Sequence, residues 1–263
     1  EVLSMNSNEL NGTLPSQIGE LSSISFLSLA SNQLSGEVPS ELGLLTSLKT
    51  LQLSLNVLTS ALPSELGLLT ALQKLQLQWN YLARIPSELQ FMADLDTLDL
   101  SHNKLASVPS QLGLLRALEM LRLSSNRLTT IPSELHWMES LYNLDLSHNQ
   151  LASIPSQLGL LRALGALELS TNRLTTIPSE LQLMESLYNL DLSTNNLASI
   201  PSELGLMTVL RQLELPGNVL THIPSELGLM AGLNTLDLSD NELTQLPSEV
   251  GLMTGLKSLH LSR

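Results

Sequence analysis

LKTLQLSLNVL, at residues 48–58, carries the pattern on which the whole chain is built. It reads LxxLxLxxNxL, and a proline follows a few residues later. The pattern is still intact near the other end of the chain, as LNTLDLSDNEL at residues 233–243. Its asparagine recurs at intervals of 24 residues three times and then of 23 residues seven times, at positions 8, 32, 56, 80, 103, 126, 149, 172, 195, 218 and 241. Self-similarity at a nearly fixed period indicates stacked structural repeats.

The leucines of each copy predict one short strand. Within LxLxx they alternate with other residues, as Leu51 and Leu53 do, and this is the period of a strand with one buried face. A single copy cannot bury its leucines, so successive copies must stack and share a core. Strands that recur with an unchanged chain direction pair in parallel. We therefore expect a parallel sheet, with the asparagines forming a ladder that satisfies backbone groups in the turns.

A proline also recurs once per copy, followed by Ser and then Glu or Gln, as in IPSEL at residues 85–89. A proline and an acidic residue near the start of a helical turn suit its free N–H groups. This predicts short helical or 3-10 turns on the side opposite the strands.

The registered LxxLxLxxNxL copies resemble the leucine-rich-repeat family over essentially the whole chain. The first copies, such as NELNGTLPSQIG at residues 8–19, look like the plant-type repeats of extracellular receptors. The 23-residue copies from residue 80 are more similar to intracellular Ras-group repeats. The resemblance implies an α/β leucine-rich-repeat solenoid, a curved horseshoe with a parallel concave β-sheet and short helical or 3-10 turns on the convex side. We expect a single domain over residues 1–263, with about ten full repeats and partial repeats at both ends.

Composition and charge exclude several classes of function. The net charge of −13 argues against a nucleic-acid binder, which needs a basic surface, and against docking on anionic membranes. The chain has no cysteine, so it has no disulfide, thiol nucleophile or cysteine-ligated metal. No metalloprotease, hydrolase, P-loop or kinase motif occurs. We therefore predict a protein that is not an enzyme and uses no cofactor or metal. The compartment stays open, with the lack of cysteines and the 23-residue copies favouring an intracellular one.

Inward positions are fixed by packing, so function is sought at the outward positions of the strands. The residue between the two strand leucines is mostly acidic in the C-terminal two-thirds of the chain, and we call this column the acidic row. Nothing in folding requires it, because like charges on neighbouring strands repel. The row indicates a protein or peptide partner of basic character. The full column is Ser28, Gln52, Gln76, Asp99, Arg122, Asp145, Glu168, Asp191, Glu214, Asp237 and His260.

Aromatic residues are rare, which makes those outside the core columns informative. Phe26, Tyr142 and Tyr188 are predicted on the strand face, and Trp79 and Tyr81 flank Asn80 at its edge. Tyr and Trp are enriched at binding hot spots. Phe91 and Trp137 instead occupy a column that is otherwise leucine, and we expect them to pack on the side of the turns.

An internal duplication supports recognition on the strand face. Residues 116–161 and 162–207 are near-copies, and several of their differences, such as Met120/Ala166 and Arg122/Glu168, fall on outward strand positions. Neutral drift at exposed sites would give the same pattern. The predicted partner-binding residues are Phe26, Trp79, Tyr81, Asp99, Met120, Arg122, Tyr142, Asp145, Glu168, Tyr188, Asp191, Glu214 and Asp237.

These features favour a protein- or peptide-binding recognition module, the ligand-sensing or scaffold part of a larger signalling protein. The alternative is a structural solenoid that uses its regularity for assembly or for binding a periodic surface such as ice, because serines recur at constant spacing. Neither end has a recognisable polar cap, and an uncapped solenoid exposes its core leucines. We therefore expect either a longer protein or self-association through the uncapped ends.

Overall fold

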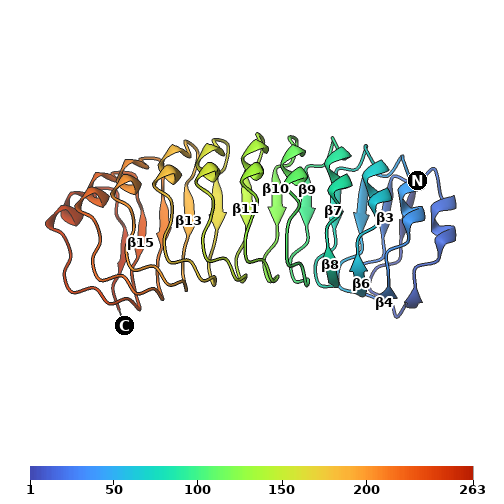
Figure 1. Cartoon of the computed structure of the whole chain (residues 1–263), viewed down its shortest axis with the longest axis horizontal. Coiled ribbons are helices and arrows are strands. Elements are labelled where there is room, and N and C mark those ends of the chain that lie inside the picture. Colours follow the sequence, from blue (N-terminus) through green and yellow to red (C-terminus); the bar gives the residue numbers. More distant parts are fainter. Residues whose placement is uncertain (263) are drawn as a thin grey trace. The chain divides into compact units, whose positions relative to one another are not determined.

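The computed structural model describes residues 1–262 and groups the chain into two compact units. Unit 1 contains Glu1–Leu128 and Trp137–Leu141. Unit 2 contains Thr129–His136 and the chain from Tyr142 onward. In Figure 1 the strands of unit 1 run from blue to green and those of unit 2 from yellow-green to red. The single domain expected over residues 1–263 stays a prediction.

Each unit contains a parallel sheet with one strand per repeat, as predicted. The strands pair in register, so that Leu27 lies opposite Leu51 in unit 1 and Leu167 opposite Leu190 in unit 2. In unit 1 the strands are β1 (Val2–Ser4), β3 (Phe26–Ser28), β5 (Thr50–Gln52), β7 (Lys74–Gln76), β9 (Thr97–Asp99) and β10 (Met120–Arg122). In unit 2 they are β11 (Asn143–Asp145), β12 (Ala166–Glu168), β13 (Asn189–Asp191), β14 (Gln212–Glu214), β15 (Thr235–Asp237) and β16 (Ser258–His260).

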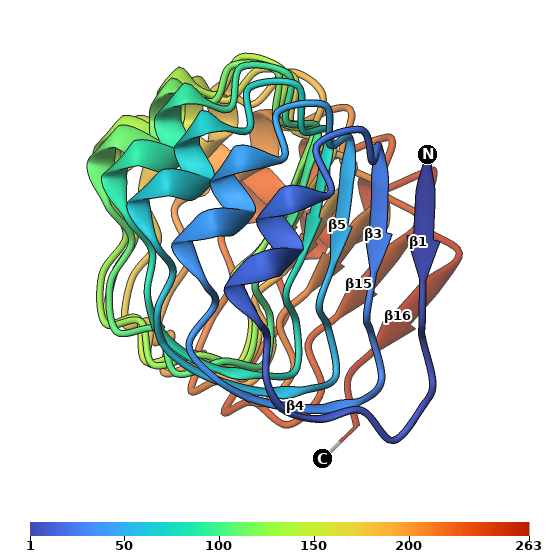
Figure 2. The ribbon, with the colours of Figure 1, turned by 90° about the vertical axis from the view of Figure 1, so that its right-hand side faces the viewer.

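Short 3-10 helices follow the recurring prolines, and within residues 1–262 the helical part of the fold consists of these turns alone. Where the cap is defined, the proline is the N-cap residue, with φ near −70° as at Pro39. Figure 2 shows these turns on the side of unit 1 opposite β1, β3 and β5. The helices are η1 (Ser16–Glu20), η2 (Ser40–Leu44), η3 (Ser64–Leu68), η4 (Ser87–Phe91), η5 (Ser110–Leu114), η6 (Ser133–Trp137), η7 (Ser156–Leu160), η8 (Ser179–Leu183), η9 (Ser202–Leu206), η10 (Ser225–Leu229) and η11 (Ser248–Leu252).

The asparagine ladder is confirmed as the polar part of the core. The Oδ1 atom of Asn56 accepts the N–H of Leu34 in the preceding repeat at 2.9 Å. Its Nδ2 atom donates to the carbonyls of Leu29 and Leu53 at 3.0 and 3.2 Å. One buried amide thus joins two repeats, because it satisfies backbone groups that the turn would otherwise leave unpaired.

A second parallel sheet in unit 1 was not predicted. It consists of β2 (Asn11–Thr13), β4 (Gln33–Gly36), β6 (Val57–Ala61) and β8 (Tyr81–Arg84), which follow the asparagines of the first four copies. Gly12 and Gly36 adopt φ of 78° and 75° there, a conformation that glycine tolerates best. The pairing shifts between Ser60 and Ala61, close to the point where the repeat shortens from 24 to 23 residues. The extra residue of the longer repeats therefore coincides with this sheet.

Candidate functional site

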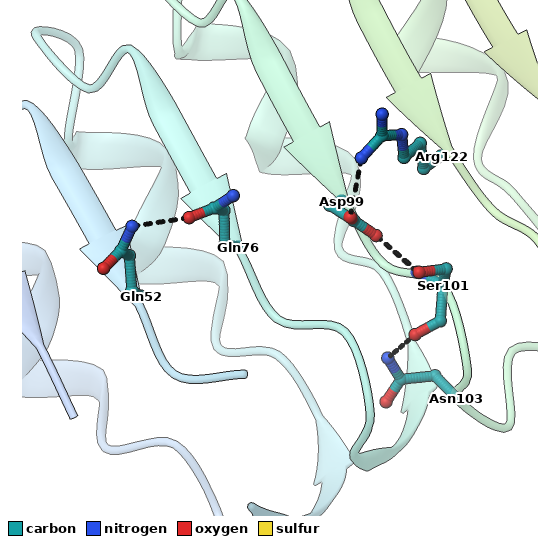
Figure 3. A network of polar contacts seen from close by, with 6 residues as sticks. All are labelled: Gln52, Gln76, Asp99, Ser101, Asn103 and Arg122. Atoms are coloured by element: carbon teal, nitrogen blue, oxygen red, sulfur yellow. Dashed lines mark hydrogen bonds and ion pairs between the residues drawn. The ribbon is translucent and has the colours of Figure 1, made fainter. Parts of the chain in front are cut away.

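In unit 1, residues of the column between the strand leucines bond to one another across neighbouring strands. Gln52 Nε2 donates to Gln76 Oε1 at 2.6 Å, and Arg122 Nη1 lies 3.7 Å from Asp99 Oδ2 (Figure 3). Asp99 is only 4% exposed, and its Oδ1 atom also accepts the N–H and hydroxyl of Ser101 at 3.0 and 2.7 Å. Asp99 and Arg122, both predicted as partner contacts, thus form an ion pair with each other, in which Asp99 is buried and Arg122 is 45% exposed.

In unit 2 the same column is a continuous acidic row. Strand register places Asp145, Glu168, Asp191, Glu214 and Asp237 opposite one another in sequence, on β11 to β15. One carboxylate oxygen of each aspartate accepts the backbone N–H of the serine two residues later, as in Asp145 with Ser147 at 3.0 Å. The described hydrogen bonds of these aspartates use Oδ1.

Within the acidic row, Glu214 lies between Asp191 and Asp237 on the neighbouring strands. Burial raises the pKa of the Glu214 carboxyl, and repulsion by Asp191 and Asp237 on the neighbouring strands raises it further. A carboxylate flanked by two others resists ionisation. A cation placed at this point would therefore be stabilised by all three groups.

Two tyrosines stand beside the acidic row. Tyr142 and Tyr188 are 52% and 38% exposed, with ring centroids 6.2 Å apart. A hydrogen bond with the Tyr142 side chain raises the pKa of Tyr188, with further contributions from burial and from electrostatic interaction with Tyr142 and Glu168. The rings meet over Gly165, where a Cβ atom would lie 2.7 Å from a ring carbon of each. The tyrosine pair, Tyr142 and Tyr188, therefore depends on glycine at position 165.

Two polar atoms under this surface have no partner. The Oδ1 atoms of Asn143 and Asn189 are enclosed and make no hydrogen bond. Both asparagines lie opposite Ala166, one on each neighbouring strand. Buried amide oxygens without a donor are costly. They therefore weaken the packing beneath the tyrosine pair and are not presented on the surface.

In unit 1 the predicted aromatic residues Trp79 and Tyr81 line a pocket of about 530 Å³. Trp79 stacks on His102 with centroids 3.6 Å apart and an interplanar angle of 9°. Lys104 Nζ lies 4.3 Å from the centroid of the Tyr81 ring, within range of a cation–π interaction. Arg127 lies in the same lining. Trp79 and Tyr81 remain 52% and 45% exposed.

The remaining predicted residues do not join either group. Phe26 and Met120 are partly buried on β3 and β10, where they pair with Thr50 and Thr97. Phe91 and Trp137, which we expected to pack on the turn side, are instead 58% and 42% exposed at the ends of η4 and η6. The recurring serines of the turns donate their hydroxyls to the next glutamate, as Ser64 does to Glu65 at 3.2 Å.

Residues that the sequence did not single out complete both groups. His102, Lys104 and Arg127 enclose the unit 1 pocket, while Gly165, Asn143 and Asn189 surround the tyrosine pair. The sequence did contain an indication for Gly165, because the first copy of the duplicated segment has Glu119 at the corresponding position. Cation–π pairing and an unpaired amide oxygen are properties of three-dimensional placement and leave no pattern in a sequence.

Among residues 1–262, no three His, Cys, Asp or Glu side chains are grouped so that they could hold a metal ion. In the same part of the chain, no helix has the length and apolar character needed to cross a membrane.

Comparison with known proteins places this geometry in context. A family model described as "Leucine-rich repeat region" matches residues 64–191, and one described as "Leucine Rich Repeat" matches residues 23–45 and 232–253. A leucine-rich-repeat protein of Leptospira interrogans is 34% identical, with 97% of this chain and 70% of that chain covered and a TM-score of 0.77. None of the curated proteins matches the chain.

Two plant receptor structures are also similar. The Arabidopsis receptor kinase HAESA, solved with the peptide hormone IDA and the co-receptor SERK1, is 33% identical, with a TM-score of 0.81. The plant peptide hormone receptor RGFR1, solved with RGF2, is 32% identical, with a TM-score of 0.74. The matches cover 99% and 98% of this chain but only 45% and 47% of those chains. This chain therefore spans less than half the length of either receptor.

Proposed function

The chain belongs to the leucine-rich-repeat family, and from this premise we propose that it is a protein- or peptide-binding module whose partner presents basic side chains to the strand face of unit 2. In this proposal the chain binds its partner and catalyses no reaction. The observation that carries the proposal is the in-register acidic row from Asp145 to Asp237 beside the exposed tyrosine pair.

Repulsion between the carboxylates of the acidic row supports the proposal of a basic partner. Each pair of like charges on neighbouring strands destabilises a sheet, within a range of roughly 0.2–1 kcal/mol. In the described chain, no lysine or arginine forms a salt bridge with Asp145, Asp191, Glu214 or Asp237. A basic partner would supply the missing countercharge and convert this repulsion into binding energy.

The aromatic residues supply the second part of the interaction. Tyrosine offers a large contact area with few rotatable bonds, and its ring face attracts ammonium and guanidinium groups. A lysine or arginine of the partner could therefore contact the tyrosine pair and a carboxylate of the acidic row together.

The test compares one basic peptide with a neutral isostere. A blocked, fluorescently labelled peptide of alternating glycine and arginine is titrated with the protein, and so is the same peptide with citrulline in place of arginine. We expect saturable binding of the arginine peptide that weakens with added salt, and at least about tenfold weaker binding of the citrulline peptide.

The variant Asp145→Asn/Asp191→Asn/Asp237→Asn should weaken binding of the arginine peptide about tenfold or more. The matched control, Glu180→Gln/Glu203→Gln/Glu226→Gln, removes the same number of charges from the turn side of the repeats. It should retain most of the affinity. Equal losses in the two variants would mean that net charge alone attracts the peptide, and the proposal would then be wrong.

We also propose that this module is the ligand-sensing or scaffold part of a larger signalling protein. Support comes from its similarity to two plant receptors that are both longer than this chain. The full open reading frame tests this point, and we expect it to encode a signalling domain next to the repeats. A reading frame that encodes repeats alone would contradict it.

A further inference from the structure

The pocket of unit 1 crosses four consecutive repeats. Leu55, Trp79 and His102 precede the ladder asparagines, whereas Tyr81, Lys104 and Arg127 follow them. The ladder residues Asn56, Asn80 and Asn103 lie between these two sets of lining residues. Their amides are already bonded to the backbone, as Asn80 is to Leu53, Leu58 and Leu77. Any selectivity of the pocket must therefore come from its two outer sets of side chains.

The cations of this pocket lack carboxylate partners. Neither Lys104 nor Arg127 forms a salt bridge in residues 1–262, although Arg116 and Arg162 pair with Glu139 and Glu185 at 3.2 and 3.1 Å. The chain as a whole carries a net charge of −13, so acidic side chains are abundant. Two cations in one pocket without an acidic neighbour create a local positive potential that attracts an anion.

The aromatic side of the pocket is flat and accessible. His102 covers one face of Trp79 in a nearly parallel stack, and about half of the Trp79 surface remains exposed. Tyr81 and Lys104 form the cation–π pair on the other side. A ligand that reaches both sides needs a flat or apolar portion next to its negative charge.

We infer that this pocket binds a carboxylate carried beside an apolar or aromatic group. The carboxylate would lie against Lys104 and Arg127, and the apolar portion against Trp79. A small organic acid and the acidic side chain of a peptide both offer this chemistry. The site is separate from the acidic row of unit 2 and selects the opposite charge, so it stands or falls independently of the proposed function.

The composition of the chain allows a specific readout. Its only two tryptophans are Trp79 and Trp137, so the variant Trp137→Phe leaves Trp79 as the sole tryptophan fluorophore. In this background, Trp79 fluorescence is titrated with 3-phenylpropionate and with its uncharged amide. A second pair of probes is the doubly blocked dipeptide Ac-Phe-Glu-NH₂ and its neutral counterpart Ac-Phe-Gln-NH₂, which have no terminal carboxylate.

We expect a saturable fluorescence change with at least one carboxylate probe, and about tenfold weaker binding of its neutral counterpart. Saturation by the organic acid alone would assign the site to small acids, and saturation by the dipeptide would assign it to an acidic side chain. Equal binding of charged and neutral probes, or no saturable change with any probe, would overturn the inference.

Removing the charges of Lys104 and Arg127 tests whether these two side chains select the carboxylate. The variant Lys104→Gln/Arg127→Gln should abolish the preference for the carboxylate while leaving the fold intact, because both side chains are exposed. The matched control is Arg173→Gln, since Arg173 is the counterpart of Arg127 in the duplicated segment and is absent from the pocket lining. The inference would also fail if the double variant bound the carboxylate as well as Arg173→Gln does.

Discussion

At the scale of single residues, the position before each ladder asparagine has a recurring backbone conformation. It adopts a positive φ in repeat after repeat, for example 60° at Trp79, 52° at Thr194 and 67° at Gly217. This left-handed region costs a residue with a Cβ atom about 1–2 kcal/mol, and β-branched residues tolerate it poorly. Most repeats therefore carry local strain, and Gly217 avoids it.

Relief of this strain is a testable source of stability. We predict that Thr194→Gly stabilises the protein by about 0.5 kcal/mol, because the strain removed exceeds the added entropy of an unfolded glycine, about 0.5–1 kcal/mol. The reverse change, Gly217→Thr, should destabilise it by about 1–2 kcal/mol. Urea unfolding midpoints measure both effects. A destabilised Thr194→Gly variant would show that its side chain contributes more than its backbone costs.

Glu214 gives a prediction that depends on pH. Its pKa is higher in the folded than in the unfolded chain, so the folded state binds the proton more tightly. The stability that this group contributes is therefore fully present below its unfolded pKa and is lost as pH rises through its folded pKa. We predict that Glu214→Gln stabilises the protein by about 0.5–1 kcal/mol at about pH 7, because it removes repulsion from two neighbouring strands.

This gain should shrink as pH falls through the raised folded pKa of Glu214 and be largely gone below about 4.3, the ordinary pKa of glutamate, because wild-type Glu214 is then protonated as well. Urea unfolding at about pH 7 and about pH 4 measures the difference. The control Glu180→Gln lies on the turn side and should change stability by less than about 0.5 kcal/mol at both pH values. A gain for Glu214→Gln that is the same at both pH values would contradict electrostatic repulsion as its cause.

At the scale of the repeat, the ladder asparagines hold neighbouring turns together. Asn195 accepts the N–H of Leu174 at 3.0 Å and donates to the carbonyls of Leu169 and Leu192 at 3.0 and 3.1 Å. We predict that Asn195→Ala costs about 2–4 kcal/mol, because it leaves buried backbone groups of two repeats without partners. The adjacent Asn196 is exposed, so Asn196→Ala should cost less than about 0.5 kcal/mol. Chemical denaturation of the two variants measures the contrast, and similar losses would refute the structural role of the ladder.

The repeat is also the scale at which the sequence is most informative. Leucine alternation, the asparagine column and the proline column each follow directly from burial and backbone hydrogen bonding, so the main sheets, the ladder and the 3-10 turns were predictable. The second sheet of unit 1 was not, because strands such as NGT at residues 11–13 have no apolar alternation. Their pairing depends on the extra residue of the longer repeats and on the geometry of neighbouring turns.

The candidate sites were only partly predictable for a related reason. Composition and column position identified the acidic row and the exposed aromatics. The ion pair of Asp99 with Arg122 depends on which strands lie side by side, and so does the closure of Tyr142 and Tyr188 over Gly165. The sequence shows which residues form the outward column. Only the structure shows that two of them in unit 1, Asp99 and Arg122, pair with each other.

At the scale of the whole molecule, we propose one binding surface in each unit, and the two proposed surfaces differ in charge. Unit 1 combines aromatic rings with the cations Lys104 and Arg127, whereas unit 2 combines the tyrosine pair with carboxylates. The leucine, asparagine and proline columns are common to both units, so the residues outside these columns set the difference in charge. A basic partner should therefore select unit 2 and leave the unit 1 pocket unaffected.

Fluorine NMR of the protein labelled with 3-fluorotyrosine tests this claim most directly. The chain has three tyrosines, of which Tyr142 and Tyr188 border the acidic row and Tyr81 lies in the unit 1 pocket. On titration with the peptide of alternating glycine and arginine, the account predicts saturable shifts of the Tyr142 and Tyr188 signals and none of the Tyr81 signal. Binding that leaves Tyr142 and Tyr188 unshifted, or that shifts Tyr81 alone, would contradict it.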